Sequence, residues 1–188
     1  HHLLRRQRQM CIRDRSVRVP MIASGPNMVR GKIEKHYTSL VDLLPTFVDL
    51  ATNEKSYEYS DNLDGKSLFG LMQGKKIDIP NELMLEFTGE GVYAPALIFI
   101  RDGIKYVHCR TDPPMMFDLN VDPEEQNNLA LEPSYLSLAN EMKSEIDKRW
   151  NYDELENKVI KSQKRRLFVQ NTLLKGKWTG WDLSLIHI

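Results

Sequence analysis

The pattern of hydrophobic and polar residues contains four short apolar runs in the middle of the chain. These runs are "ELMLEF" (82–87), "ALIFIR" (96–101), "IKYVHCR" (104–110) and "PPMMFDL" (113–119). Runs of this length, separated by turn-forming residues, are typical of β-strands, and the "RDG" at 101–103 is typical of a tight hairpin turn. We therefore predict a small antiparallel sheet of about four strands.

The residues before this sheet follow other patterns. "SVRVPMIAS" (16–24) is apolar on both faces, which indicates a buried strand of a parallel sheet. "TSLVDLLPTFVDLA" (38–51) carries a helical stripe of apolar residues with Thr38 or Ser39 as its N-cap. Pro45 inside that stripe predicts either a kink or the start of a second helix. "LDGKSLFGLMQG" (63–74) predicts a turn and a short helix that ends at Gly74.

The residues after the sheet are mainly helical in pattern. "DPEEQNNLA" (122–130) predicts a turn and a helix start, because its carboxylates suit the positive end of a helix dipole. Residues 133–150 and 152–176 predict two polar amphipathic helices. The predicted fold class is α/β, with the edge of a parallel sheet followed by a small C-terminal antiparallel sheet packed with helices.

The two ends of the chain are unlike the rest. "RRQRQMCIRDR" (5–15) is strongly basic and has no apolar period. The DNA string ATG TGT ATA AGA GAC AG encodes residues 10–14 and opens the next codon, and its reverse complement, CTG TCT CTT ATA CAC AT, encodes "LSLIHI" (183–188). This relation indicates that residues 1–15 and 183–188 are a translated sequencing-library adapter. A basic arm that binds nucleic acid is the alternative, and it leaves the relation unexplained.

Setting the two ends aside changes the charge of the chain. The whole sequence has 26 Lys and Arg and 26 Asp and Glu; the two ends hold five Arg and one Asp, so 21 and 25 remain and the net charge becomes −4. An acidic remainder argues against a nucleic-acid partner. Cys109 is then the one remaining cysteine, which suits a reducing compartment, and we expect a cytoplasmic protein. No apolar run approaches the length of a membrane span, so we expect no membrane partner.

Several segments, in their order along the chain, resemble the C-terminal part of type I sulfatases, in the alkaline-phosphatase superfamily. The segments that carry this resemblance are "VRVPMIASGP", "SLVDLLPTFVDLA", "LDGKSL" and "MMFDLNVDPEEQNNLA". In the last of them Phe117 stands where the family has tyrosine. A narrower resemblance to choline-sulfatases rests on "LEFTGEGVYAP", "IRDGIKYVHCRTDPPMMFDL" and residues 149–182, with Phe87 where tyrosine is usual.

This resemblance implies a domain organisation. Residues 16–80 would be the C-terminal end of the catalytic α/β domain, 81–150 a small α+β subdomain, and 151–182 a truncated helical tail. The expected parent protein is a sulfuric ester hydrolase that uses a formylglycine and a divalent cation, calcium first, with manganese or magnesium as alternatives. The family makes its formylglycine from a cysteine in a Cys-x-Pro-x-Arg type motif, and none follows Arg15. We therefore assign no catalytic residue and no metal ligand, and expect the fragment alone to be inactive.

The resemblance also implies a substrate, choline-O-sulfate. Its trimethylammonium group is charged but donates no hydrogen bond, so aromatic faces and carboxylates hold it. By resemblance we expect Glu86 to face the choline cation, with Glu90 in the following Gly-flanked loop as the second choice. The alternative is that Glu86 and Glu90 are both solvated charges at the end of a strand, without a role in binding. The family further implies a homo-oligomer formed through the C-terminal tail.

Other functions and residues stay open at this point. The rival functions are a sulfatase or phosphonate monoester hydrolase for another small ester, and a sulfatase-like binding module without catalysis. His36 and His108 lack the spacing of metal ligands, and Cys109 alternates with apolar residues, so structural roles are expected for all three. Residues 164–166 are basic but lie beside acidic helix positions, which indicates a solvated or interface surface. Trp178 and Trp181 could form an aromatic wall or pack within the tail.

Overall fold

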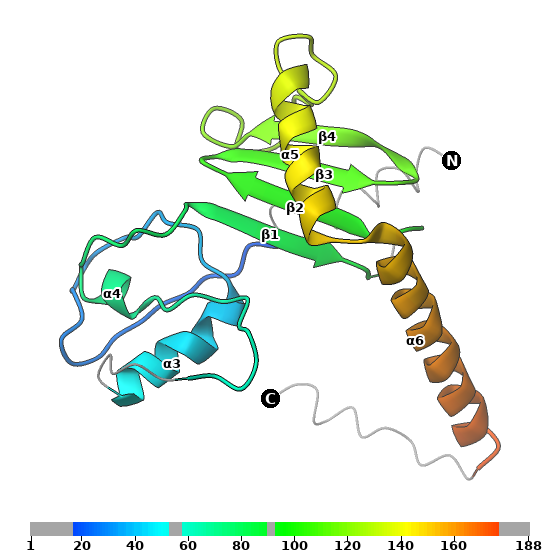
Figure 1. Ribbon diagram of the computed structural model, residues 1–188, viewed down its shortest axis with the longest axis horizontal. Coiled ribbons are helices and arrows are strands. Elements are labelled where there is room, and N and C mark those ends of the chain that lie inside the picture. The colour runs from blue at the N-terminus through cyan, green and yellow to red at the C-terminus, as the bar shows by residue number, and fades with distance from the viewer. Residues whose placement is uncertain (1–16, 53–57, 90–92, 177–188) are drawn as a thin grey trace. The chain divides into compact units, whose positions relative to one another are not determined.

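The computed structural model describes residues 17–52, 58–89 and 93–176 (Figure 1). The chain divides into two compact units, one up to Ile146 and one from Asp147 onward. The elements in chain order are η1 (Leu40–Asp42), α3 (Leu43–Thr52), α4 (Phe69–Met72), β1 (Glu82–Phe87), β2 (Ala96–Arg101), β3 (Ile104–Cys109), β4 (Asp112–Asp118), α5 (Leu136–Arg149) and α6 (Tyr152–Leu173).

The four strands form one antiparallel sheet in the order β1-β2-β3-β4. In the two-residue connection between β2 and β3, Asp102 and Gly103 have φ values of 49° and 90°. Two consecutive residues with positive φ are typical of the hairpin turn whose twist matches that of the strands. The predicted antiparallel sheet is therefore confirmed, and each strand ends within a residue of its predicted bounds.

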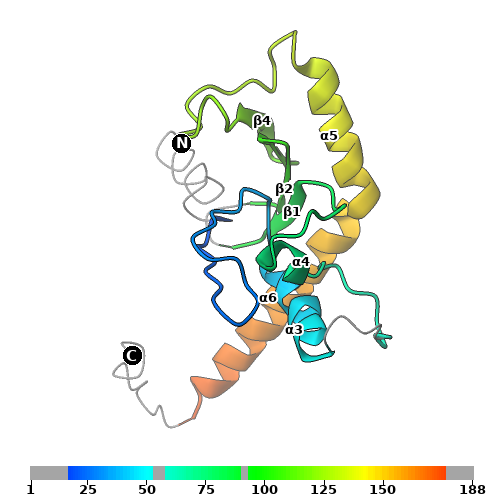
Figure 2. The same cartoon turned by 90° about the vertical axis from the view of Figure 1, so that its left-hand side faces the viewer.

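Side chains cover both faces of the sheet. Five consecutive β2 residues, Ala96 to Ile100, are buried, as expected for a strand packed on both sides. On one face lies an apolar cluster made of Ala94, Ala96, Ile98, Ile100, Val107 and Cys109. Helix α5 lies along the other face (Figures 1 and 2), where Arg101 Nη1 donates to Glu141 Oε1 at 2.8 Å. The α5 side chains buried there are Ala139, Met142 and Ile146. This sheet is the core of the first unit.

The helical region before the sheet starts at Ser39, the N-cap of η1. Pro45 falls in the first turn of α3, where a proline is tolerated because the N–H it lacks has no partner within the helix. The second of the two predicted alternatives is thus confirmed: a second helix, α3, starts at Leu43, directly after η1 and two residues before the proline. The predicted short helix is confirmed as α4, and Gly74 follows it with a φ of 78°.

The predicted strand over 16–24 is wrong for the described part of that range. Residues 18–24 form no strand, and their side chains are exposed to solvent. A strand of a parallel sheet needs a neighbouring parallel strand to satisfy its backbone groups. The described part of the chain supplies none, because its one sheet is antiparallel throughout.

The predicted helix start at 122–130 is also wrong, since the next helix, α5, begins at Leu136. The Asp122 carboxylate accepts the backbone N–H groups of Gln126 at 3.0 Å and Asn127 at 2.8 Å. Glu125 has a positive φ of 53°, which ends any helical run at that position. The carboxylate therefore organises a turn in place of a helix terminus.

The second unit contains α6. Asn151 caps this helix by accepting the N–H of Glu154 at 3.1 Å, and Lys158 pairs with Glu154 one turn apart. Both predicted C-terminal helices are confirmed, as α5 and α6. Within the described ranges, no helix has the length and apolar character that a bilayer crossing requires.

Candidate functional site

Glu86, the residue expected to contact substrate, lies near the end of β1. The β1 side chains that pack against the apolar cluster are Leu83, Leu85 and Phe87. Successive side chains of a strand point to opposite faces, so Glu86 projects from the face that α5 covers further along. Glu86 pairs in register with Leu97 of β2, and its side chain is exposed. The structure thus places this carboxylate at the solvent-facing margin of the sheet.

Polar residues from several strands gather at the same end of the sheet. Ala96 pairs with Cys109, and Cys109 with Asp112, so the end of β1, the start of β2, the end of β3 and the start of β4 lie together. Polar and aromatic residues at this end are Glu86, Tyr93, His108, Arg110 and Asp112. We call this group the loop end of the sheet.

Tyr93 gives the loop end an accessible aromatic ring. It belongs to the loop between β1 and β2, and its side chain is 71% exposed. A carboxylate and an aromatic face borne by one end of a sheet are the two kinds of group that hold an organic cation. Glu90, the second candidate, lies outside the described residues, as do Trp178 and Trp181.

The described residues do not fit the metal and formylglycine of the family. They contain no group of three or more His, Cys, Asp or Glu side chains that could hold a metal ion. Cys109 is a buried strand residue whose Sγ lies 3.6 Å from the Ala94 carbonyl oxygen and 3.3 Å from Thr111 Oγ1. It is followed by Arg-Thr-Asp, so it lacks the sequence that the family converts. Its predicted place in the core is confirmed.

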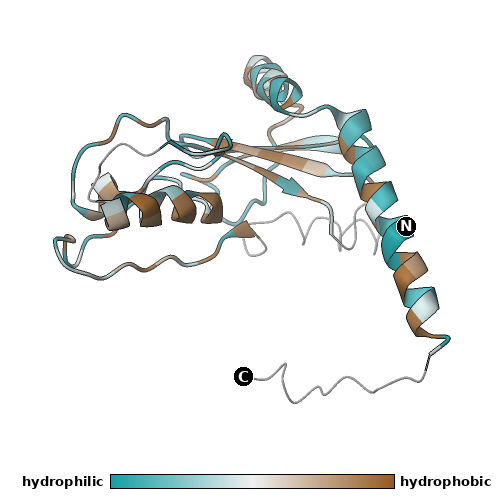
Figure 3. Ribbon diagram, turned by 60° about the horizontal axis from the view of Figure 1, so that its bottom comes forward, coloured by the Kyte–Doolittle hydropathy of each residue, from teal (hydrophilic) through white to brown (hydrophobic). Residues whose placement is uncertain are grey.

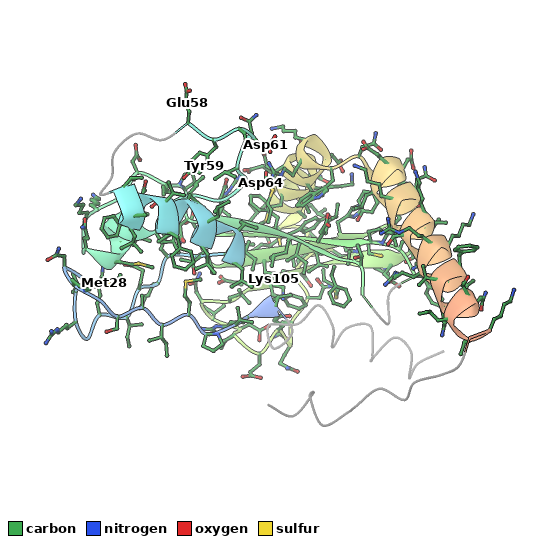
Figure 4. All side chains as sticks on the ribbon, turned by 90° about the horizontal axis from the view of Figure 1, so that it is seen from below. Met28, Glu58, Tyr59, Asp61, Asp64 and Lys105 are labelled. Carbon is green, nitrogen blue, oxygen red and sulfur yellow. The ribbon has the colours of Figure 1, made fainter. Side chains whose placement is uncertain are left out.

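A buried ion pair on β3 was not predicted. Lys105 Nζ lies 2.7 Å from Glu125 Oε1, and the two side chains are 0% and 2% exposed. Figure 4 shows Lys105 among the side chains around the sheet, whereas Glu58 points away into solvent. The sequence held a signal, because Lys105 shares a strand face with Val107 and Cys109. A lysine at a core position requires a buried carboxylate partner.

The turn that carries Glu125 is tied to the sheet by further polar bonds. Asn128 Oδ1 accepts the N–H groups of Met116 at 2.9 Å and Ala130 at 3.0 Å, and its Nδ2 donates to the Pro114 carbonyl at 3.2 Å. At Asp122, the N–H groups of Asn127 and Gln126 hold the pKa of the carboxyl below its ordinary value of 3.8. These bonds show that the polar residues of this turn hold its structure in place. The candidate recognition site is therefore the loop end of the sheet.

The sequence of this chain is similar to those of known proteins. Residues 6–152 match the family model described as N-sulphoglucosamine sulphohydrolase, C-terminal. The chain is 34% identical over 174 residues to the choline-sulfatase of Rhizobium meliloti (strain 1021), covering 89% of this chain and 32% of that protein. It is 32% identical over 155 residues to the multifunctional alkaline phosphatase superfamily protein PehA of Trinickia caryophylli, covering 73% and 29%.

A solved structure shares the fold. The structure of a 2-O GAG sulfatase matches 67% of this chain and 28% of its own, with a TM-score of 0.57 and 27% identity. The chain spans about a third of the length of the curated relatives it matches. The sequence matches point to the sulfatases, and the solved structure of a sulfatase shares the fold of this chain. The chain belongs to the sulfatases, as a member of the N-sulphoglucosamine sulphohydrolase C-terminal domain family.

Proposed function

We propose that this chain forms the C-terminal part of a choline-sulfatase, which hydrolyses choline-O-sulfate to choline and inorganic sulfate. The observation that carries the proposal is the similarity to the Rhizobium meliloti choline-sulfatase, which extends over 89% of this chain. The nucleophile and the metal ligands would belong to residues outside the described part. A divalent cation bound there would polarise the sulfate oxygens. The part played by this chain is recognition of the substrate.

We place the choline end of the substrate at the loop end of the sheet. A trimethylammonium group cannot be recognised by hydrogen bonds, so its selectivity comes from charge and from aromatic faces. Glu86 supplies an exposed carboxylate and Tyr93 an exposed ring on the connection that follows. Recognition groups commonly lie on loops that a rigid sheet positions. In this proposal Glu86 faces the cation and Tyr93 lies close to it.

The test is a substrate comparison in a complete enzyme. Suitable enzymes are the product of the complete source gene, or a chimera in which residues 17–176 replace the matched region of the Rhizobium meliloti protein. Glu86→Gln keeps the shape of the side chain and removes its charge. We expect it to lower kcat/KM for choline-O-sulfate by about tenfold, because a cation loses a close opposite charge. Turnover of an aryl sulfate should change by less than about twofold, since no choline is involved.

A matched control separates recognition from general charge effects. Glu132→Gln removes another exposed carboxylate, distant in sequence from the loop end, and both substrates should respond equally. Equal losses on the two substrates in Glu86→Gln would contradict the choline site. They would favour the rival function, a hydrolase for another small ester. No turnover of any sulfate ester by a folded complete enzyme would favour a non-catalytic binding module.

We also propose that the complete protein is a homo-oligomer assembled through its C-terminal region. The C-terminal end of α6 and its C-cap carry exposed apolar side chains: Leu167, Phe168, Val169, Leu173 and Leu174. Exposed apolar groups of this extent on one helix are typical of an interface. Phe168→Glu in the complete enzyme should reduce the mass measured by light scattering to that of a smaller assembly. An unchanged mass would contradict this role for α6.

A further inference from the structure

His108 interrupts the apolar pattern of the sheet. Hydrophobic colouring prevails along the middle of the sheet in Figure 3, and the neighbours of His108 on β3, Tyr106, Val107 and Cys109, are buried. His108 itself is half-buried and belongs to the loop end of the sheet. A partly exposed polar side chain at this place can contact both the sheet and a bound molecule.

The register of the strands places His108 on the same face as Glu86. Glu86 of β1 is paired with Leu97 of β2, and Leu97 is paired with His108 of β3. Directly opposite residues of an antiparallel sheet point to the same face, so these three side chains form one row across the strands. Neighbouring strands lie about 4.8 Å apart, which puts the backbones of Glu86 and His108 about 10 Å from each other. Leu97 is 0% exposed, so the carboxylate and the imidazole flank a covered apolar residue.

An irregularity in the pairing of β3 with β4 lies at His108. Val107 is paired with Met115, and Cys109 is paired with Asp112, so one residue of β3 faces two prolines of β4. Proline lacks the backbone N–H for a ladder bond and is found in strands mainly at edges and bulges. Bulges are common next to functional sites, where they change the direction of a side chain. The register and the bulge therefore both single out His108, independently of the family resemblance.

Charged and titratable groups surround His108 on several elements. On β3 they are Tyr106, which is buried, and Arg110, directly after the strand. On β4 it is Asp112, and β2 contributes an uncharged residue to the row. The α5 side chains buried against the sheet are uncharged, and Lys143 and Glu145 flank them on the helix. Charges of both signs thus lie around the imidazole, with Glu86 as the carboxylate in its row.

We propose that His108 is a specificity-determining residue of the choline site, a role that rests on the proposed function. Its neutral imidazole is compatible with the organic cation, whereas its protonated form repels that cation. A trimethylammonium group keeps its positive charge at every pH. Histidine is the side-chain type whose ordinary pKa, about 6.5, puts its change of charge between pH 5 and 8. The preference of the enzyme for a cationic substrate therefore depends on pH in this range.

The experiment measures the preference between two alkyl sulfates that differ in charge. Choline-O-sulfate carries the trimethylammonium group, and 3,3-dimethylbutyl sulfate has a neutral tert-butyl group of the same shape in its place. Both esters are supplied together to the complete enzyme, so that the ratio of their kcat/KM values is measured directly. Effects of pH on the sulfate chemistry are common to both esters and cancel in this ratio. The ratio is followed from about pH 5.5 to about pH 8, where histidine side chains change charge.

Three enzymes should give three different profiles. In the parent, the ratio should be about fivefold lower at the acid end, because two like charges repel each other across a partly solvated site. His108→Gln keeps a neutral polar group and should hold the ratio at the alkaline value of the parent throughout. His108→Arg carries a permanent positive charge and should keep the ratio low throughout. Turnover of the neutral ester by each variant shows that the variant is folded.

His36→Gln is the matched control. His36 is the other histidine of the described residues, and its neighbour Tyr37 donates its N–H to Asn81 at 2.8 Å. Asn81 directly precedes β1, so His36 lies near the end of that strand opposite to Glu86. This variant should reproduce the pH dependence of the parent.

The results that overturn this role of His108 differ from those that overturn the choline site. A ratio that does not change with pH in the parent overturns the role, and so does the same acid fall in His108→Gln as in the parent. A parent enzyme without a preference for choline-O-sulfate at about pH 8 contradicts the choline site itself, and the role of His108 with it. A preference that Glu86→Gln abolishes, but that neither substitution of His108 alters at any pH, contradicts only the role of His108.

Discussion

Two regions of the first unit bury their side chains in opposite ways. In the sheet, Phe99 is 0% exposed and the apolar residues of β2 are covered on both faces. In η1–α3, the polar Thr46 is buried while Phe47 lies in solvent. Both regions have well-formed hydrogen bonds, so they differ in what covers their apolar surface. The sheet has its own cover, whereas the apolar side of the helical pair lies in solvent.

This difference shows that a region can form its helices and hydrogen bonds while its apolar surface stays uncovered. The sheet obtains α5 as the cover of one face, and on its other face Val17 and Tyr37 pack against the apolar cluster that its own side chains form. The η1–α3 pair obtains from its neighbourhood only the loop at 65–68, which binds its polar side. A chain that covers 32% of a relative thus contains one finished core beside a helical pair whose apolar side is exposed.

The largest expected effect on the free energy of unfolding comes from Phe99 in the sheet, and Phe47 in α3 is its comparison. Phe99→Ala should reduce the free energy of unfolding of the isolated chain by about 4 kcal/mol, because it opens a cavity in a closed core. Phe47→Ala should change it by less than about 0.5 kcal/mol, because its side chain is already solvated. Urea unfolding followed by circular dichroism measures both. Equal losses would show that Phe47 packs against the chain in solution and would break the comparison.

A somewhat smaller effect is expected at the buried ion pair. Lys105→Ala leaves Glu125 buried without its cation and should cost about 3 kcal/mol. The double variant Lys105→Met/Glu125→Leu removes both charges and should recover most of that loss. The same urea titration tests both variants. If the double variant is as unstable as Lys105→Ala, removing both charges does not restore stability. The ion pair would then be needed to hold the turn in place.

The next effect concerns the turn that closes β4. Asn128→Ala removes three hydrogen bonds, two of them from the N–H groups of Met116 and Ala130, and should cost about 2 kcal/mol. Hydrogen exchange at the amide of Met116 should accelerate in the variant. Unchanged exchange would show that water replaces the side chain without cost. Asn127→Ala is the control, because its side chain makes none of these three hydrogen bonds.

The smallest effect is a pH dependence at Asp122. Its pKa is held below the ordinary value of 3.8 by the N–H groups of Asn127 and Gln126. A lowered pKa means that this carboxylate stabilises the fold above pH 3.8 and that the contribution is lost as the pH falls through the folded-state value. Asp122→Asn should therefore show a flatter dependence of the urea midpoint on pH in that acidic window. Identical slopes for the two proteins would contradict the assignment.

Much of the fold could be predicted because its signals are local. Short apolar runs bounded by turn residues, such as Asp102-Gly103, specify β1 to β4, and Pro45 in the first turn of α3 marks the start of a second helix. The strand expected at 16–24 depends on parallel neighbours that the described chain does not supply. The Asp122 segment failed as a helix start because a carboxylate that suits a helix terminus also organises a turn.

The candidate site was less accessible to prediction than the fold. Pattern alone gives Glu86 as one more carboxylate at the end of a strand, and its assignment came from resemblance to a family. The structure adds its exposure and the exposed ring of Tyr93 on the following loop. The Lys105–Glu125 pair joins residues 20 positions apart, and only the strand-face position of Lys105 indicated that a partner existed.

Native-state hydrogen exchange of the isolated chain, read by mass spectrometry of peptides, tests the contrast between the two regions most directly. Peptides from β2 and β3 should exchange only through global unfolding, because their amides belong to a core covered on both faces. Peptides from residues 17–33 and from α3 should exchange much faster, through local opening of a region without a cover. Equal protection of α3 and β2 would contradict the account, since it would mean that the helical pair is already complete in this chain.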